Sequence, residues 1–232
     1  MKINRSFRLL QTQRGVSLVE LMITMVIGLV MLIALGYFFL GSRQINRTTD
    51  DVSRMQESGR NALELIGKAV RQAGYRKDAN VAFSGIALTG VDGSPDSITV
   101  QYEAQEGGEV DCAGNTFGAG AATELVTYAF AIAGATLTCN GVAQVDNVED
   151  MQIEYGIDAT KDGIVESYKT APTVAEFAQV AAVRVILQVV GPSANIATAG
   201  KVYQNLSGVD IPVDGHLRQV YRATYTVRNQ AG

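Results

Sequence analysis

Side chains that commonly perform catalysis are scarce in this sequence. His216 is the only histidine among 232 residues, so any histidine-based acid–base scheme would have to use it. No serine sits in a nucleophile-elbow motif, and no glycine-rich phosphate loop follows a strand-like segment. Cys112 and Cys139 are the only cysteines and have no histidine beside them, which argues against a zinc site. These absences predict that the protein is not an enzyme and that His216 lies at the surface.

Tryptophan is missing as well, and proline is rare. The chain has no Trp, 24 Gly and four Pro, the first of which is Pro95. This composition favours a loop-rich β structure over a helical bundle for most of the chain. Because proline interrupts helices, its absence before Pro95 permits one long N-terminal helix.

The N-terminal region contains a long apolar run with a single charge inside it. Residues 16–40 are almost entirely apolar, and Glu20 lies near the start of the run. About 20 apolar residues are enough to cross a bilayer, whereas a carboxylate inside such a run is costly and normally has a partner. A leader with four basic and no acidic residues precedes the run: Lys2, Arg5, Arg8 and Arg14. The sharp junction at Gly15-Val16 lies before the run, whereas a secretory signal would be cleaved after it.

This arrangement resembles the class III signal of type IV pilins and their relatives. The resemblance implies that a prepilin peptidase cuts after Gly15, removes residues 1–15 as a leader, and methylates the new N-terminus at Val16. It also implies that Glu20, now fifth in the chain, pairs with the N-terminal ammonium of the neighbouring subunit during assembly. Val16 departs from the phenylalanine of many members, and Tyr37 stands where major pilins often have a proline, which suggests a minor member. A membrane anchor with an accidental glutamate is the alternative.

A helical period continues beyond the apolar run. Small and apolar residues recur at steps of three and four: Val52, Met55, Gly59, Ala62, Ile66, Ala69 and Ala73. We therefore expect one helix from about residue 16 to residue 75, with 16–40 in the membrane or filament core and 41–76 as an amphipathic continuation. Two helices broken at residues 41–42 are the alternative.

Residues 77–232 have the pattern of strands separated by long loops. Apolar and β-branched residues alternate, and we expect strands at 97–102, 124–130, 135–138, 148–155, 180–190 and 221–227. Loops rich in Gly and Ser are expected at 103–122, 156–176 and 191–214. An amphipathic helix followed by strands predicts an α+β fold with the helix packed on an antiparallel sheet. This agrees with the pilin fold that the resemblance implies, with 77–232 as a globular β-rich extracytoplasmic domain.

Several fragments resemble, in their order and spacing, the PilW family of minor pilins. They are G-R-N-A-L at 59–63, R-Q-A-G-Y at 71–75, V-E-D-M-Q-I-E-Y-G at 148–156, A-V-R-V at 182–185 and Y-R-A-T-Y-T-V-R-N at 221–229. The resemblance implies a minor pilin in a complex that primes type IV pilus assembly at the pilus tip. The implied partners are other minor pilins, the major pilin, the prepilin peptidase and the inner-membrane assembly platform. The implied location is the inner membrane before assembly and the extracellular pilus afterwards.

Three alternatives to this function stay open at this point. One is a J-type minor pseudopilin of type II secretion, which shares the same plan. Another is a tip adhesin or DNA-uptake pilin with a ligand site on its loops, and the third is a membrane-tethered enzyme. Removing residues 1–15 leaves 15 basic and 23 acidic residues, a formal charge of −8, which disfavours direct contact with nucleic acid.

The two cysteines predict a disulfide in the exported domain. An even cysteine count in an oxidising compartment favours a bond between Cys112 and Cys139. The expected strands at 124–130 and 135–138 lie between them, so the bond would join the ends of a hairpin. It would remove about 3 kcal/mol of unfolded-chain entropy. Free thiols or a metal site are the alternatives.

A short acidic segment partly matches a calcium-binding loop. Asp158, Thr160, Asp162 and Glu166 supply oxygen side chains at positions one, three, five and nine, with Gly163 at position six. Lys161 lies inside the loop, however, and Lys169 occupies position twelve, where a bidentate glutamate belongs. We therefore expect a polar turn and no cofactor, with weak calcium binding as the alternative.

Overall fold

The computed structural model describes residues 15–105, 107–119, 123–197 and 200–229. Residues 1–14 of the predicted leader lie outside the described residues. The chain divides into two compact units, Met1–Asn46 and Arg47–Gly232. The predicted boundaries at residues 40 and 76 remain predictions.

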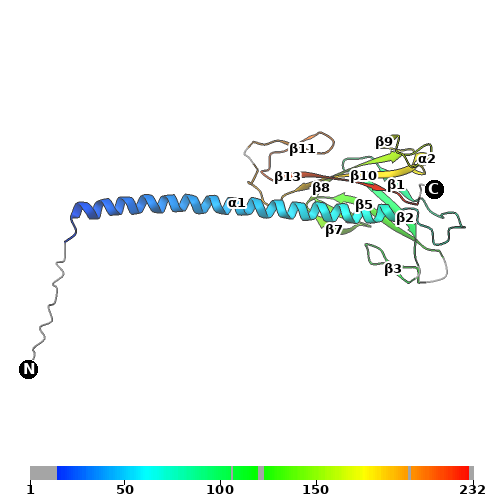
Figure 1. Cartoon of the computed structure of the whole chain (residues 1–232), viewed down its shortest axis with the longest axis horizontal. Coiled ribbons are helices and arrows are strands. Elements are labelled where there is room, and N and C mark those ends of the chain that lie inside the picture. Colours follow the sequence, from blue (N-terminus) through cyan, green and yellow to red (C-terminus); the bar gives the residue numbers. More distant parts are fainter. Residues whose placement is uncertain (1–14, 106, 120–122, 198–199, 230–232) are drawn as a thin grey trace, which may run out of the picture. The chain divides into compact units, whose positions relative to one another are not determined.

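A single α-helix, α1, covers Leu18–Gln72 (Figure 1). This confirms the prediction of one long helix, and no break occurs at residues 41–42. The helix ends three residues earlier than expected because Gly74 adopts a left-handed conformation, with φ of +69°. The Gly74 N–H then donates to the Gln101 carbonyl at 2.9 Å, so the chain leaves the helix against a strand.

Within the first unit, the stretch of α1 from Leu21 to Leu40 is apolar on every side. Every side chain from Leu18 to Leu40 is exposed. This stretch of α1 is long and apolar enough to cross a membrane. A helix that is apolar all round needs an apolar environment such as lipid or other helices.

The second unit contains two antiparallel sheets. The first has the order β1-β2-β5-β6-β7, and the second has the order β13-β10-β8-β9. The strands of the first sheet are β1 Leu88–Val91, β2 Ser97–Glu103, β5 Leu125–Ala133, β6 Thr136–Cys139 and β7 Val142–Asp146. The strands of the second sheet are β8 Val148–Ile157, β9 Ser167–Lys169, β10 Val180–Val190 and β13 Arg218–Thr226. The α+β class with a helix on antiparallel sheets is thus confirmed.

One core joins α1 to both sheets. The helix contributes Ala62, Ile66, Ala69 and Val70, and Ala73 follows it directly; all five are buried. The alternating residues predicted on one face of β10, from Val183 to Val189, are fully buried. Burying an apolar side chain of this size stabilises the fold by about 1.5–3 kcal/mol, so this stripe explains why the helix lies on the sheets.

Two glycines let β13 lie directly on the helix. A Cβ at Gly59 would collide with the ring of Tyr221, and one at Gly67 would collide with the ring of Tyr225. The Tyr225 hydroxyl also donates to the Leu63 carbonyl at 2.7 Å. The last sheet strand therefore packs on α1 through ring-on-glycine contacts.

The expected loops contain short elements that the sequence did not predict. Between β2 and β5 lie β3 Glu109–Val110 and β4 Thr116–Phe117, which pair with each other. Between β10 and β13 lie β11 Tyr203–Gln204 and β12 Asp210–Ile211, which also pair. A one-turn helix, α2 Val174–Phe177, precedes β10 and begins at a capping box formed by Thr173 and Glu176. Strands β1, β7 and β9 were missed as well.

Candidate functional sites

The N-terminal motif lies at the start of α1. Gly15, Val16 and Ser17 are non-helical, and α1 begins at Leu18. Glu20 is the acidic residue of the first helical turn, where the positive end of the helix dipole favours a carboxylate. Its side chain is exposed among exposed apolar residues. A carboxylate in apolar surroundings is costly unless it is paired.

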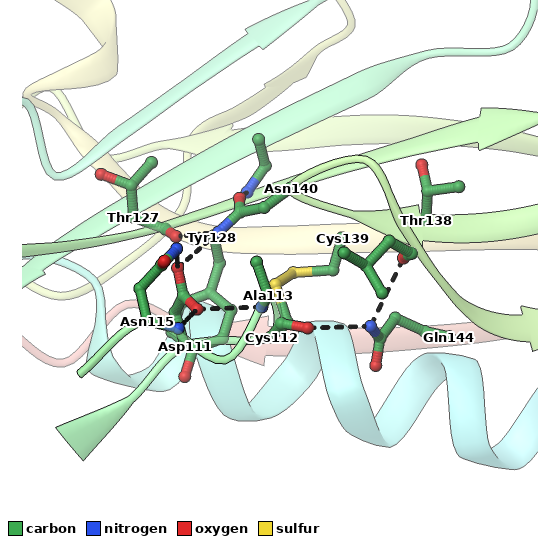
Figure 2. Close-up of a disulfide and its surroundings, with 12 residues drawn as sticks. Asp111, Cys112, Ala113, Asn115, Thr127, Tyr128, Thr138, Cys139, Asn140 and Gln144 are labelled. Carbon is green, nitrogen blue, oxygen red and sulfur yellow. Dashed lines mark hydrogen bonds between the residues drawn. A yellow bond between two sulfur atoms is a disulfide. The ribbon is translucent and has the colours of Figure 1, made fainter.

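Cys112 and Cys139 form the predicted disulfide, with Cα atoms 5.9 Å apart (Figure 2). Cys139 is the last residue of β6 and is fully buried. Cys112 lies between β3 and β4, so the bond ties this turn to the sheet. The expectation that it would join the ends of one hairpin was wrong, because Cys112 lies in the turn of the β3–β4 pair and not at the start of β5.

Asp111 holds the same turn by four hydrogen bonds (Figure 2). Its carboxylate accepts from the backbone N–H groups of Ala113 (2.9 Å) and Asn115 (2.8 Å). It also accepts from the side-chain amides of Asn115 (3.0 Å) and Asn140 (3.1 Å). Burial by itself would raise the pKa of Asp111, but these hydrogen bonds outweigh it and lower the pKa. The turn therefore has both a covalent and a polar anchor.

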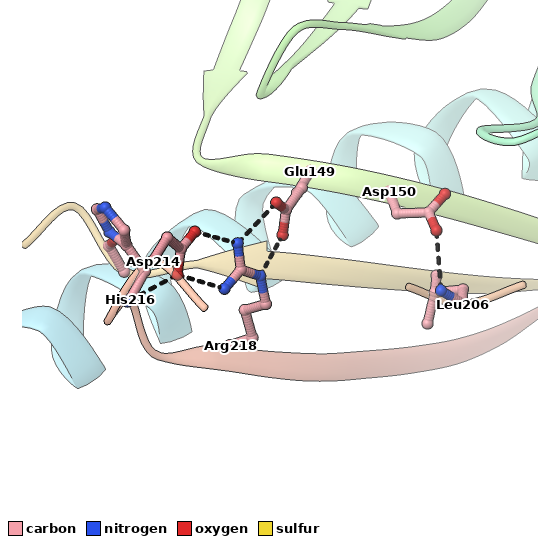
Figure 3. A network of polar contacts seen from close by, with 7 residues as sticks. Glu149, Asp150, Leu206, Asp214, His216 and Arg218 are labelled. Carbon is pink, nitrogen blue, oxygen red and sulfur yellow. Dashed lines mark hydrogen bonds and ion pairs between the residues drawn. The ribbon is translucent and has the colours of Figure 1, made fainter. Parts of the chain in front are cut away.

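The segment between β10 and β13 is anchored by ion pairs instead (Figure 3). Arg218 has a side chain only 4% exposed, and its guanidinium lies between Glu149 and Asp214. Its Nε donates to Glu149 at 2.7 Å, and its Nη2 donates to Asp214 at 2.6 Å. The hydrogen bond from Arg218 lowers the pKa of Asp214 well below its usual range. The C-terminal end of the segment is thereby fixed to Glu149 of β8.

Two further carboxylates, both buried, hold this segment. Asp51 of α1 is 2% exposed and accepts from the hydroxyl (2.8 Å) and the backbone N–H (3.0 Å) of Ser193. Asp150 of β8 accepts from the Leu206 N–H at 2.9 Å. Both carboxylates therefore use their charge to hold the backbone of one loop.

His216 was expected at the surface, but the structure shows it half-buried. Its Nδ1–H donates to the Gly191 carbonyl at 2.7 Å, which sets the tautomer. The ring therefore helps to close the β10–β13 segment. In Figure 3 the ring lies at the Asp214 end of the polar network.

The anchors of this segment were missed by sequence reasoning. Glu149 lies 69 residues from Arg218, and Asp214 precedes Arg218 by four residues in a loop, where no periodic pattern marks the pair. Asp51 did leave a signal, because it lies four residues before Met55 on the buried stripe of α1. A carboxylate in that register needs a buried partner.

The acidic segment after β8 forms a compact turn. The Asp158 carboxylate accepts from the N–H groups of Asp162 (3.2 Å) and Gly163 (2.8 Å). The Glu166 carboxylate accepts from the Thr160 hydroxyl at 2.7 Å, and hydrogen bonds lower the pKa of Glu166. Oxygens of Asp158, Asp162 and Glu166 lie within 4.8 Å of one another, as a cation site would require. Lys169 instead pairs with Glu176, outside this turn.

Comparison with known proteins gives matches at both ends of the chain. Residues 10–36 match the model of the prokaryotic N-terminal methylation motif. Residues 115–229 match the model of the type IV pilus-assembly protein W family, PilW. A solved type IV-like pilin from Thermus thermophilus is 17% identical, with a TM-score of 0.49 over 80% of this chain and 98% of that one. The curated proteins contain no match.

Proposed function

Because the chain is a type IV pilin of the PilW family, we propose that it is a minor pilin that joins other minor pilins in a complex priming pilus assembly at the pilus tip. The observation that carries this proposal is that one chain joins the methylation motif to a PilW domain. The match to PilW supports a pilus subunit over a J-type pseudopilin of a secretion system.

The proposed maturation begins at the junction before α1. The basic leader holds Gly15 at the cytoplasmic face of the inner membrane, where the prepilin peptidase cuts before Val16 and methylates its amine. The apolar stretch of α1 anchors the chain in this membrane until assembly. The globular unit then lies in the periplasm and finally outside the cell, which is consistent with the disulfide between Cys112 and Cys139.

In the proposed assembly step, Glu20 selects the position of the neighbouring subunit. An isolated carboxylate in an apolar phase is costly, and pairing it with a cation removes much of that cost. The N-terminal ammonium of the neighbour's Val16 is such a cation. Pairing would fix the axial register between two apolar helices, whose packing surfaces alone specify register weakly.

The proposed role is structural and not catalytic. Arg218, Asp51 and Asp150 each hold a backbone segment or another side chain in place. His216 donates to a backbone carbonyl. These side chains support a rigid unit that displays surfaces to other subunits.

The test compares Glu20→Ala and Glu20→Gln with the wild type in cells that make pili. We expect both variants to reach the membrane at the wild-type level, because each change raises the apolarity of α1. Co-purification with sheared pili should fall strongly in both, since neither variant carries the charge. Equal incorporation of variant and wild type would contradict the assembly role.

Two further measurements address processing and priming. Mass spectrometry of assembled material should find an N-methylated Val16 terminus, and an intact Met1 there would contradict the proposed cleavage. Deleting the gene that encodes this chain should reduce the number of pili per cell. A pull-down with this protein as bait then separates two roles. Capture of other minor pilins indicates an assembly subunit, and capture of glycans indicates an adhesin.

A further inference from the structure

The longest free sheet edge in the described part of the globular unit belongs to β13. It spans nine residues and pairs only with β10, without a register shift. The other outer strands of the two main sheets, β1, β7 and β9, span four, five and three residues. Long free edges invite strand addition, and proteins usually shorten or block them. An edge of this length is therefore a feature that needs an explanation.

The register shows which backbone groups this edge offers. The Val227 N–H donates to the Ala181 carbonyl of the neighbouring strand. In an antiparallel ladder, alternate residues direct both backbone groups to the same side. The N–H and C=O groups of Val220, Arg222, Thr224 and Thr226 therefore point away from β10. All four residues are exposed.

A groove runs beside this edge. It has a volume of about 460 Å³ and lies between α1 and β13. Leu63, Tyr221 and Tyr225 form its apolar floor, and Arg60 and Arg71 line its helix side. An added strand would form hydrogen bonds with the outward N–H and C=O groups of β13. Alternate side chains of the added strand would then enter this groove.

The charge at the edge is opposite to that of the chain. Arg60, Arg71 and Arg222 have no ion pair among the described residues, whereas Glu64 is the one acidic residue lining the groove. Without residues 1–15 the chain carries a formal charge of −8. A cationic edge on an acidic protein favours an acidic partner through electrostatic complementarity.

We propose that β13 accepts an extended acidic segment of a different pilin subunit as an additional strand. This inference rests on the proposed function, since it names the surface through which the minor pilin meets a neighbour. A second copy of this chain is a poorer occupant. Symmetric pairing of two β13 strands would bring their Arg222 side chains together on one face, and like charges across strands are destabilising.

The test places a photo-crosslinker at the edge in the full-length chain in piliated cells. p-Benzoylphenylalanine replaces Val220 or, as the control, Val142 of β7; both side chains are 43% exposed. We expect crosslinks from position 220 to a segment of another pilin that carries Asp or Glu, and about tenfold fewer from position 142. Equal yields, a crosslink to a second copy, or a crosslink to a protein that is not a pilin would overturn the proposal.

Two matched pairs of variants distinguish strand addition from simple proximity. Thr224→Pro removes an outward N–H without removing a bond to β10, and proline is tolerated at such edge positions. It should reduce the crosslink about tenfold, whereas Thr224→Val keeps the N–H and should not. Arg222→Glu should reduce it similarly, and Arg76→Glu, which changes an arginine that neither belongs to β13 nor lines the groove, should not. An unchanged yield in Thr224→Pro and Arg222→Glu would overturn the proposal.

The outcome is separable from that of the proposed function. The number of pili in the deletion strain tests priming whether or not β13 is an interface. If the deletion strain makes fewer pili, as expected, but no crosslink forms at position 220, this surface is rejected and the minor-pilin role is retained.

Discussion

The segment between β2 and β5 and the segment between β10 and β13 both leave a sheet, form two short paired strands, and return to it. The first is held by the bond between Cys112 and Cys139, supported by Asp111. The second has no covalent anchor and is held by Asp51, Asp150 and Arg218. The same loop design is therefore stabilised once by a redox-dependent bond and once by charge.

This contrast teaches where each segment is vulnerable. A disulfide is insensitive to pH and salt but is lost on reduction. Ion pairs and charged hydrogen bonds survive reductant but lose strength when a carboxylate is protonated. We therefore expect reduction to destabilise the segment between β2 and β5, and acid to destabilise the segment between β10 and β13.

The largest expected effect is loss of the disulfide. Cys112→Ala combined with Cys139→Ala should lower the free energy of unfolding by about 3 kcal/mol, since the bond closes a loop of 27 residues. Urea unfolding followed by tyrosine fluorescence measures this, because the chain has no Trp. Hydrogen exchange should accelerate at 104–119 and stay unchanged at 203–217. Acceleration in both segments would show that the disulfide does not stabilise the first segment alone.

Arg218→Ala should have the next largest effect. It leaves Glu149 and Asp214 facing each other without a cation, and we expect a loss of about 2–3 kcal/mol, discounted because both carboxylates are partly exposed. Hydrogen exchange should now accelerate at 203–217 and not at 104–119. Arg222→Ala, an exposed arginine of the same strand, is the matched control and should change the unfolding free energy little.

Asp51→Ala tests the anchor on the helix. It leaves the N–H and hydroxyl of Ser193 without their acceptor in a partly buried place, which should cost about 1–3 kcal/mol. Asp51→Asn keeps one acceptor oxygen and should cost less. Equal losses in the two variants would show that charge, and not the acceptor, matters here.

Asp214 should make the second segment sensitive to acid. The hydrogen bond from Arg218 depresses the pKa of Asp214 in the folded state, so its contribution is present above the unfolded pKa of about 3.9 and is lost as the pH falls below it. The wild type should therefore lose more of its melting temperature between pH 7 and pH 3 than Asp214→Asn. Parallel pH profiles of the two proteins would contradict this.

The smallest effect is expected from calcium. Asp158, Asp162 and Glu166 lie together, but Lys161 is in the loop and the twelfth position lacks a glutamate. The melting temperatures in EDTA and in millimolar calcium should differ little. A large rise with calcium that Asp162→Ala abolishes would show that the turn is a cation site.

Much of the fold was predictable because its signals are local. The apolar stripe from Met55 to Ala73 repeats at the helical period, and the alternation in β10 repeats at the strand period. The disulfide was predictable because only two cysteines exist. The short strands β3, β4, β11 and β12 were missed, since two residues carry no periodic signal and pairing depends on the surrounding anchors.

The sequence by itself determined the apolar run at 16–40, the position of Glu20 within it, the basic residues before it, and the periodic faces that become the core. These are properties of adjacent residues and of hydrophobic period, which do not depend on the rest of the fold. Only the tertiary structure decided that Asp51, Glu149 and Asp150 hold one loop. It also decided that β13 lies at an edge beside α1. Those groups meet through contacts between distant parts of the chain, which no local pattern records.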